Sequence, residues 1–257
     1  MKPVNILLLL ILPLAFASCM DTREELEIKK DGSGTLVMKT DLSKMLEMMK
    51  GFAPESDLTK DGLDRPYDTI MLMKDYIDTA SDVTAEQKAL LRDGKVHIVM
   101  NVKENIGKFD IHLPFSSTDK LQQLYASLNS SSNGLKGMFG GLGKGLPKGP
   151  EEQGNNKGMP QLASVYDIIV KNGLYSRKVN KERYDQFTGA IKLDELKQMG
   201  SMFGAMNYTL SVKLPRAVKR VSNSSATISD DKVMVTLKSD LMEAMQHPEL
   251  LALDIEY

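Results

Sequence analysis

The sequence has no tryptophan, and aromatic residues make up only 6% of its 257 positions. This scarcity argues against an exposed aromatic platform of the kind that holds sugars or bases. Basic and acidic residues nearly cancel, with 33 Lys and Arg against 34 Asp and Glu and a formal net charge of −1. A nucleic-acid partner is therefore not expected, because the chain has no basic excess to neutralise phosphates.

Cysteine occurs once, as Cys19, so no internal disulfide can form. The fold must take its stability from a packed core, and a chain of this length can bury one. Cys19 follows a basic start at Lys2, an apolar run over residues 6–16 and two small residues, which is the three-part layout of a secretory signal. A membrane-spanning helix is disfavoured, because it needs about 20 apolar residues and Pro13 interrupts this shorter run.

The leader and Cys19 together resemble a bacterial lipoprotein signal, in which the cysteine thiol is diacylated and cleavage leaves the cysteine as the first mature residue. The resemblance implies a signal peptide over residues 1–18, lipid attachment at Cys19 and a lipid-anchored tether over residues 19–25. Phe16 departs from the leucine that is usual three positions before the cysteine. No later apolar segment of the sequence is long enough to span a bilayer, so attachment falls to the lipid, and several acyl chains anchor firmly where one does not.

Residues 26–257 are expected to form a single α+β domain, with a largely antiparallel sheet built from hairpins and amphipathic helices packed on one face. A turn over Asp31–Ser33 would pair Lys30 with Gly34 and place Leu26, Ile28, Leu36 and Met38 on one face. A loop over residues 104–107 would pair Val102 with Phe109. Asn172-Gly173 is a strong hairpin signal between two further strands. Later strands are expected over residues 208–214, 226–228, 232–237 and 250–257.

Caps and apolar periodicity predict the helices. They are expected after Asp41 up to Gly51, over residues 66–77, after a capping box at Thr84 up to Gly94, after Ser117 or Thr118, around residues 191–203, and briefly after Ser239-Asp240. Residues 129–160 hold nearly half of the 19 glycines and are expected to form a flexible Gly-, Ser- and Pro-rich insertion. Apolar residues are spaced along this insertion, so contact with a membrane or with a partner is the alternative to a simple mobile insertion.

No catalytic motif is found. A Gly-x-Ser-x-Gly elbow is absent, and Gly140–Lys144 lacks the spacing and the Ser or Thr of a phosphate loop. In the predicted register His97 faces Pro114 and His112 faces Val99. The two histidines are then diagonal neighbours roughly 7–8 Å apart.

Two histidines so placed could share a metal only with a third ligand, such as Asp110 or Asn101. Structural zinc sites have four protein ligands, so neither a metal nor a cofactor is predicted. The 17 methionines could bind Cu(I), but most fall at the spacing of helix core positions.

The leader with Cys19, the hairpin at residues 30–34 and the segment Phe109–Phe115 before a capped helix resemble uncharacterised lipoproteins of Bacteroidota-type envelopes. Residues 214–237 are similar to the LppM-type lipoprotein domain. That similarity implies an α/β module near lipid or lipoglycan, and it brings no matched catalytic residues. Asp68-Thr69-Ile70 and Asp78-Thr79-Ala80 look like the short O-glycosylation motif of such envelopes.

The sequence therefore predicts a non-enzymatic lipoprotein of the cell envelope, held by Cys19 at the outer membrane on its periplasmic or surface face. Its domain would bind or scaffold another envelope protein or lipid. The alternative is a lipid- or ligand-binding module with a cleft between sheet and helices, and an enzyme is the third hypothesis. A lipid binder needs an enclosed apolar pocket, a scaffold needs an exposed apolar patch, and an enzyme needs convergent polar groups with perturbed pKa values.

Overall fold

The computed structural model describes residues 20–52, 65–78, 83–130, 162–171, 173–190 and 205–257. These residues form two sheets, mostly antiparallel, and six α-helices, so the predicted α+β class is confirmed. Most of the buried apolar side chains of both sheets and of the helices belong to one contiguous core.

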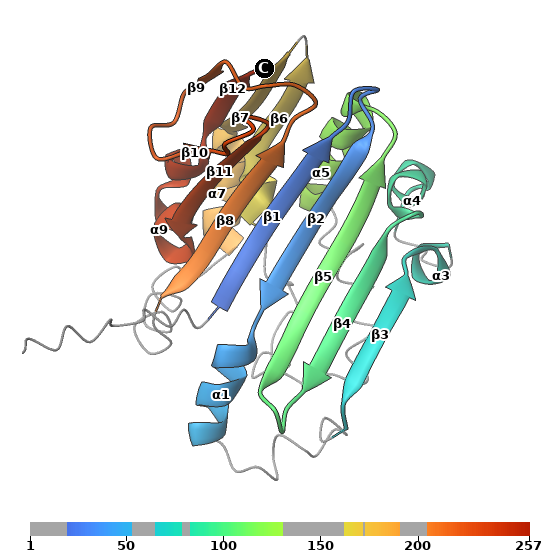
Figure 1. Ribbon diagram of the computed structural model, residues 1–257. Coiled ribbons are helices and arrows are strands. Elements are labelled where there is room, and N and C mark those ends of the chain that lie inside the picture. The colour runs from blue at the N-terminus through green and yellow to red at the C-terminus, as the bar shows by residue number, and fades with distance from the viewer. Residues whose placement is uncertain (1–19, 53–64, 79–82, 131–161, 172, 191–204) are drawn as a thin grey trace, which may run out of the picture.

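The larger sheet has eight strands in the order β10-β11-β8-β1-β2-β5-β4-β3 (Figure 1). Their bounds are β1 Met20–Ile28, β2 Gly34–Asp41, β3 Tyr67–Leu72, β4 Lys95–Asn101, β5 Ile106–Phe115, β8 Met206–Lys213, β10 Thr227–Ile228 and β11 Met234–Asp240. The strands β1 and β8 are parallel neighbours, and the other neighbours are antiparallel. The first described strand therefore lies in the middle of the sheet.

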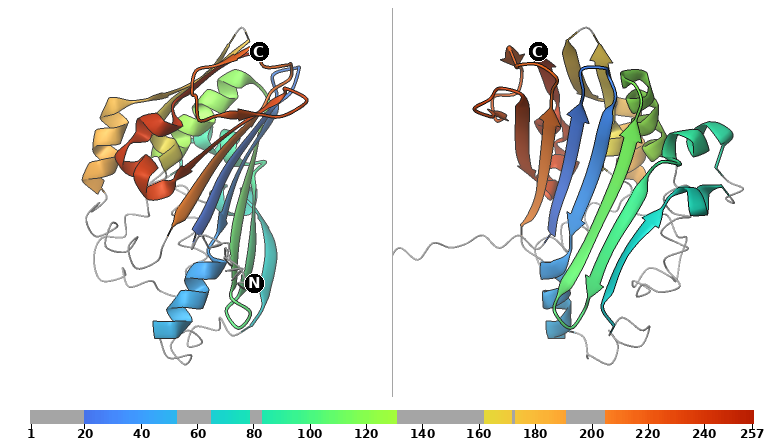
Figure 2. Two further views of the ribbon diagram at one scale, coloured as in Figure 1. Left: turned by 60° about the vertical axis from the view of Figure 1, so that its left-hand side comes forward. Right: turned by 45° about the vertical axis from the view of Figure 1, so that its right-hand side comes forward.

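The smaller sheet has four strands in the order β6-β7-β12-β9. Their bounds are β6 Tyr166–Lys171, β7 Leu174–Val179, β9 Arg220–Val221 and β12 Leu253–Glu256. The helices are α1 Ser43–Phe52, α3 Lys74–Ile77, α4 Ala85–Leu91, α5 Thr118–Ser130, α7 Lys181–Ala190 and α9 Leu241–Gln246, with 3-10 turns at Leu162–Val165 and Pro248–Leu251. Figure 2 shows α5, α7, α9 and the smaller sheet on one side of the larger sheet, and no described element covers its other face.

The first hairpin has the predicted faces but a different register. Leu26 and Ile28 are buried as expected, yet Leu26 pairs with Leu36 and Ile28 with Gly34. The turn is still three residues long but lies one residue earlier, because Gly32 adopts the left-handed conformation (φ 82°) that ends this type of turn. The change of register by an even step keeps every side chain on its predicted face.

The second hairpin shows the same kind of correction. Its turn covers residues 102–105, with Asn105 in the left-handed region at φ 57°, and Asn101 pairs with Ile106. The predicted pairing of Val102 with Phe109 is wrong, and Val102 is a buried turn residue. The third hairpin has the predicted two-residue turn, since Lys171 pairs with Leu174.

Most predicted helix starts are confirmed by their caps. The Thr84 hydroxyl accepts from the Gln87 N–H while the Gln87 side chain accepts from the Thr84 N–H, which completes the capping box. Ser117 accepts from the Lys120 N–H at the start of α5, and Asp240 accepts from two N–H groups of α9. Gly51 does not end α1, which continues to Phe52.

Two segments have a different secondary structure from the predicted one. The predicted helix over residues 66–77 is wrong for its first half, because residues 67–72 form β3 against β4 and only residues 74–77 are helical. The predicted tether over residues 19–25 is also corrected, because β1 begins at Met20 and is hydrogen-bonded to strands on both sides. The helix α7 was not predicted.

Four predicted features lie outside the described residues: the leader, Cys19, the part of the insertion after residue 130, and the helix at 191–203.

Gly34 gives a steric test of the first hairpin. A Cβ at this position would lie 1.9 Å from the Glu27 carbonyl oxygen and 2.4 Å from Phe115 Cζ. Because backbone cannot move aside, Gly34→Ala is expected to lower the free energy of unfolding by about 1–3 kcal/mol in urea denaturation. The control is Gly51→Ala in α1, where a Cβ meets nothing within 4 Å and about 0.5–1 kcal/mol of stabilisation is expected. Equal urea midpoints for Gly34→Ala and wild type would contradict this packing.

Candidate functional site

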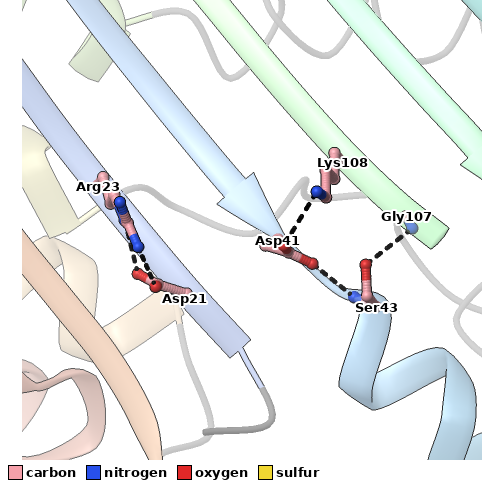
Figure 3. Close-up of polar contacts among 6 residues, drawn as sticks. All are labelled: Asp21, Arg23, Asp41, Ser43, Gly107 and Lys108. Carbon is pink, nitrogen blue, oxygen red and sulfur yellow. Dashed lines mark hydrogen bonds and ion pairs between the residues drawn. The ribbon is translucent and has the colours of Figure 1, made fainter. Parts of the chain in front are cut away.

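The end of the larger sheet nearest Cys19 carries two separate groups of polar contacts (Figure 3). The Arg23 guanidinium lies 2.8 Å from the Asp21 carboxylate, and Lys108 Nζ lies 3.8 Å from Asp41 Oδ2. Asp41 Oδ1 accepts from the Ser43 N–H at 2.9 Å, and Ser43 Oγ accepts from the Gly107 N–H at 3.2 Å. The contacts of Asp41 and Ser43 join the end of β2, the start of α1 and β5, whereas the Arg23–Asp21 pair lies within β1.

This end of the sheet carries the predicted anchor. Cys19 itself lies outside the described residues, but Met20 is already part of β1. Consecutive Cα atoms are about 3.8 Å apart across a trans peptide, so one peptide unit separates Cys19 from a central strand. An acyl group on Cys19 would therefore hold this end of the domain directly at the bilayer.

The open face of the larger sheet is polar at its centre, where ion pairs cross between neighbouring strands. Ion pairs across neighbouring strands join Lys39 to Glu25 at 2.7 Å and Lys213 to Glu27 at 2.9 Å. All four of these side chains are partly exposed. Exposed ion pairs contribute about 0–1 kcal/mol each, so this face is a hydrated surface that adds little to stability. The scaffold hypothesis called for an exposed apolar patch, and the centre of this face does not provide one.

A cluster of buried polar groups joins the two sheets. We call it the Glu24 cluster; it consists of Glu24 in β1, Tyr208 in β8, Tyr125 in α5, Tyr166 in β6, and Tyr175 and Arg177 in β7. Arg177 Nη1 donates to Glu24 Oε1 at 2.7 Å, and the hydroxyls of Tyr125 and Tyr208 donate to the two oxygens of the same carboxylate. The Arg177 guanidinium also lies 3.9 Å from the centre of the Tyr166 ring. Glu24 is 1% exposed and Arg177 0%.

Burial and charge act in opposite directions on this cluster. Burial raises the pKa of the Tyr125 and Tyr208 hydroxyls well above the ordinary value, and the neighbouring Glu24 carboxylate raises both further. Burial acts most strongly on Arg177 and disfavours its charged form, but the Glu24 carboxylate and the neighbouring tyrosines together raise the pKa of Arg177. Arg177 is therefore a permanent cation, held in the core by one carboxylate.

The Glu24 cluster is not fully satisfied. Arg177 Nε and Nη2 and the Tyr175 hydroxyl are buried without a hydrogen-bond partner in the described part of the chain. Because every member is buried, a substrate would have to open the core to reach it. The arrangement orients the two sheets relative to one another rather than presenting a group to solvent. The cluster was not predicted, although Glu24 stands two positions before buried Leu26 and Arg177 two after buried Tyr175, where an alternating strand pattern places core residues.

The cluster predicts a loss of stability at high pH. Burial raises the pKa of Tyr125, Tyr166, Tyr175 and Tyr208 in the folded state. Stability is thus unaffected below the ordinary tyrosine pKa and falls as pH rises above about 10, by about 1.4 kcal/mol per pH unit for each tyrosine that ionises only on unfolding. We expect the share of the tyrosinate absorbance that belongs to these four buried tyrosines to appear together with the loss of far-UV circular dichroism. Reversible ionisation of all eight tyrosines before unfolding would contradict the burial.

The structure gives the histidines other strand partners than the predicted ones. His97 faces Asp110 and His112 faces Lys95, so the predicted partners Pro114 and Val99 are wrong. His97 Nε2 lies 2.7 Å from Asp68 Oδ1 in the edge strand β3. Burial, and then the nearby Lys95 charge, lowers the pKa of His112. Within the described ranges, no group of three or more His, Cys, Asp or Glu side chains is placed to hold a metal ion.

The remaining candidates are weaker. A surface hollow of about 290 Å³ lies between α4 and α5. Apolar and polar side chains both line it: Ala89, Leu90, Pro114, Phe115 and Leu124, and Asp93, Ser116 and Lys120. Thr69 of the first glycosylation motif is half-buried in β3, and Thr79 of the second lies outside the described residues. Among the helices that the structure describes, none is long and apolar enough to cross a membrane.

Comparison with known proteins found no relative of the chain. No family model, no curated protein and no solved structure matches the chain significantly. The resemblances to Bacteroidota-type lipoproteins and to the LppM-type domain stay predictions.

Proposed function

We propose that the chain is a lipid-anchored protein of a bacterial cell envelope, acylated on Cys19, whose α+β domain acts by binding or scaffolding and not by catalysis. The observation that carries the proposal is the position of Cys19. It is the single cysteine, it follows a leader of the secretory type, and it directly precedes the central strand β1.

The placement of β1 supports this role. A lipid on Cys19 leaves no linker between the anchor and the sheet, so the domain would be held at a fixed height on the membrane. The strand pairing ties this end of β1 to β2, and the contacts of Asp41 and Ser43 in Figure 3 tie the end of β2 to α1 and β5. A rigid domain held close to the bilayer suits a protein that presents a surface to neighbouring envelope components.

The distribution of polar groups favours a binding surface over an internal site. The polar groups with the largest pKa changes are closed inside the core, whereas the broad face of the larger sheet is open. In the described region, the tyrosines of the Glu24 cluster fill the space between the two sheets. The alternative of a ligand cleft between sheet and helices has the surface hollow beside α4 and α5 as its candidate. The open face and the edges of the sheet are the surfaces available to a partner.

Mass spectrometry of the native protein, purified from membranes in detergent, tests this proposal. The mature chain is expected to begin at Cys19 and to carry acyl chains on its sulfur, with an envelope component co-purifying. The matched control is the Cys19→Ala protein from the same cells, which should carry no acyl mass. A mature chain that begins at another residue, or that carries a free thiol at Cys19, would overturn the proposed anchor.

A further inference from the structure

The strand β3 ends the larger sheet, and no other strand of the described residues pairs with its outer side. Met73 continues the β3–β4 register and its N–H donates to the Gly94 carbonyl at 2.9 Å. Hydrogen-bonded and non-hydrogen-bonded pairs alternate along antiparallel strands, so Tyr67, Thr69 and Met71 bond to β4. The N–H and C=O groups of the intervening residues Asp68, Ile70 and Leu72 therefore point away from the sheet.

The side chains along this edge are unusually apolar for a surface. Ile70 is 58% exposed, Leu72 42%, Tyr67 43% and Tyr76 in α3 37%. These four make up half of the large exposed apolar side chains in the described residues. An open edge with apolar side chains is a template for another strand, and natural proteins normally protect such edges by charge, by a covering segment or by pairing.

We propose that β3 pairs antiparallel with β3 of a second copy of this chain, about a two-fold axis at Ile70, to form one continuous sheet across a homodimer. In this register Ile70 faces Ile70, and Asp68 faces Leu72 of the second copy. All three outward N–H groups of each β3 then reach a carbonyl acceptor. Because the side chains of paired strands stay on the same face, both copies present their open faces in the same direction.

Charge selects this register. Pairing Asp68 with Asp68 would place two carboxylates opposite each other, which is unfavourable. The proposed register places Asp68 of one copy beside Leu72 of the other, and Leu72 lies beside Lys95 of β4. Asp68 and Lys95 would then stand two strand spacings apart, roughly 10 Å between Cα atoms, which a lysine side chain can bridge. Lys95 makes no ion pair within the described residues, so it is available for this contact.

The same register also covers the exposed tyrosines. It places Tyr67 of one copy opposite Met73 of the other, directly before α3, which carries Tyr76. Each of the four exposed apolar side chains thus gains a neighbour. A strand from a different protein could use the same backbone groups, but the fit of Asp68, Ile70 and Leu72 to their own copies favours the second copy.

Cysteine cross-linking tests the register. Ile70→Cys is made in the full chain with Cys19→Ala, so that it introduces the one cysteine present. Hydrogen-bonded antiparallel partners have Cα atoms about 5.5 Å apart, within the range of a disulfide, so mild oxidation should give a disulfide-linked dimer. Leu72→Cys is the matched control, because the two substituted positions would lie roughly 13 Å apart and should not cross-link.

A second variant separates pairing from folding. The Ile70 N–H points outward, so Ile70→Pro removes no bond to β4, and proline is tolerated at such edge positions. The variant is expected to keep its far-UV circular dichroism and to change from dimer to monomer in light scattering after size exclusion. Wild-type protein that is monomeric in detergent solution, Leu72→Cys that cross-links as well as Ile70→Cys, or a disulfide to a different protein would each overturn the proposal. None of these outcomes depends on acylation of Cys19.

Discussion

Arg177→Met is expected to lower the free energy of unfolding by about 3–5 kcal/mol, the largest effect we expect from a single substitution in the domain. The substitution leaves the Glu24 carboxylate buried without its cation, which is more costly than the loss of the contact itself. Tyr125 and Tyr208 continue to donate to the carboxylate, but neutral hydroxyls do not balance its charge. Urea denaturation followed by circular dichroism measures the change.

The double variant Glu24→Gln with Arg177→Met separates a buried charge from a lost contact. Glutamine keeps an oxygen that accepts from the tyrosines, and no unpaired charge is then left in the core. Replacing both members of a buried pair is often neutral or stabilising, so the double variant should be more stable than Arg177→Met alone. Lys181→Met is the surface control, because its pair with Asp185 is 87% and 59% exposed and should change stability by less than about 1 kcal/mol. Simple additivity of the two core substitutions would contradict the coupling.

Cys19→Ala is expected to move the protein from the membrane fraction to the soluble fraction. The proposed lipid is attached there, and no described helix offers a second way to cross the bilayer. Several acyl chains hold a protein on a membrane firmly, whereas their complete loss leaves only weak surface contacts. Fractionation of cell envelopes, with immunodetection of the domain, measures the distribution.

Stability provides the control for this variant. Position 19 precedes the first strand, so the urea midpoint of Cys19→Ala should match that of the wild type. A Cys19→Ala protein that remained with membranes through the same N-terminal attachment would show that the anchor is not the acylated cysteine. An altered urea midpoint would instead point to unfolding as the cause of any redistribution.

Local chemistry accounts for the parts of the fold that could be predicted. The capping box at Thr84, the cap at Asp240 and the Asn172-Gly173 turn each act within a few residues, and all three were placed from the sequence. The turns of the first two hairpins were placed one or two residues late. Alternation specifies the face of a side chain, but it does not distinguish registers that differ by an even step.

Tertiary pairing explains the remaining misses. Residues 67–72 carry apolar side chains that suit either a helix or a strand. They form a strand because their backbone pairs with β4. The cluster of Glu24 and Arg177 joins residues 153 positions apart in the chain, a separation over which no local pattern gives information. The candidate anchor could be found from sequence because a leader and its cysteine are contiguous.

The sequence by itself determined the class of the fold, the faces of its strands, several helix caps and the expectation of a lipid on Cys19. These depend on neighbouring residues, through alternation, capping and turn geometry. The tertiary structure alone decided that β1 is a central strand, that an ion pair lies between two sheets, and that β3 is the edge strand of the described sheet. These depend on which distant segments lie side by side, since hydrogen bonds between strands and charges buried in a core exist only once those segments meet.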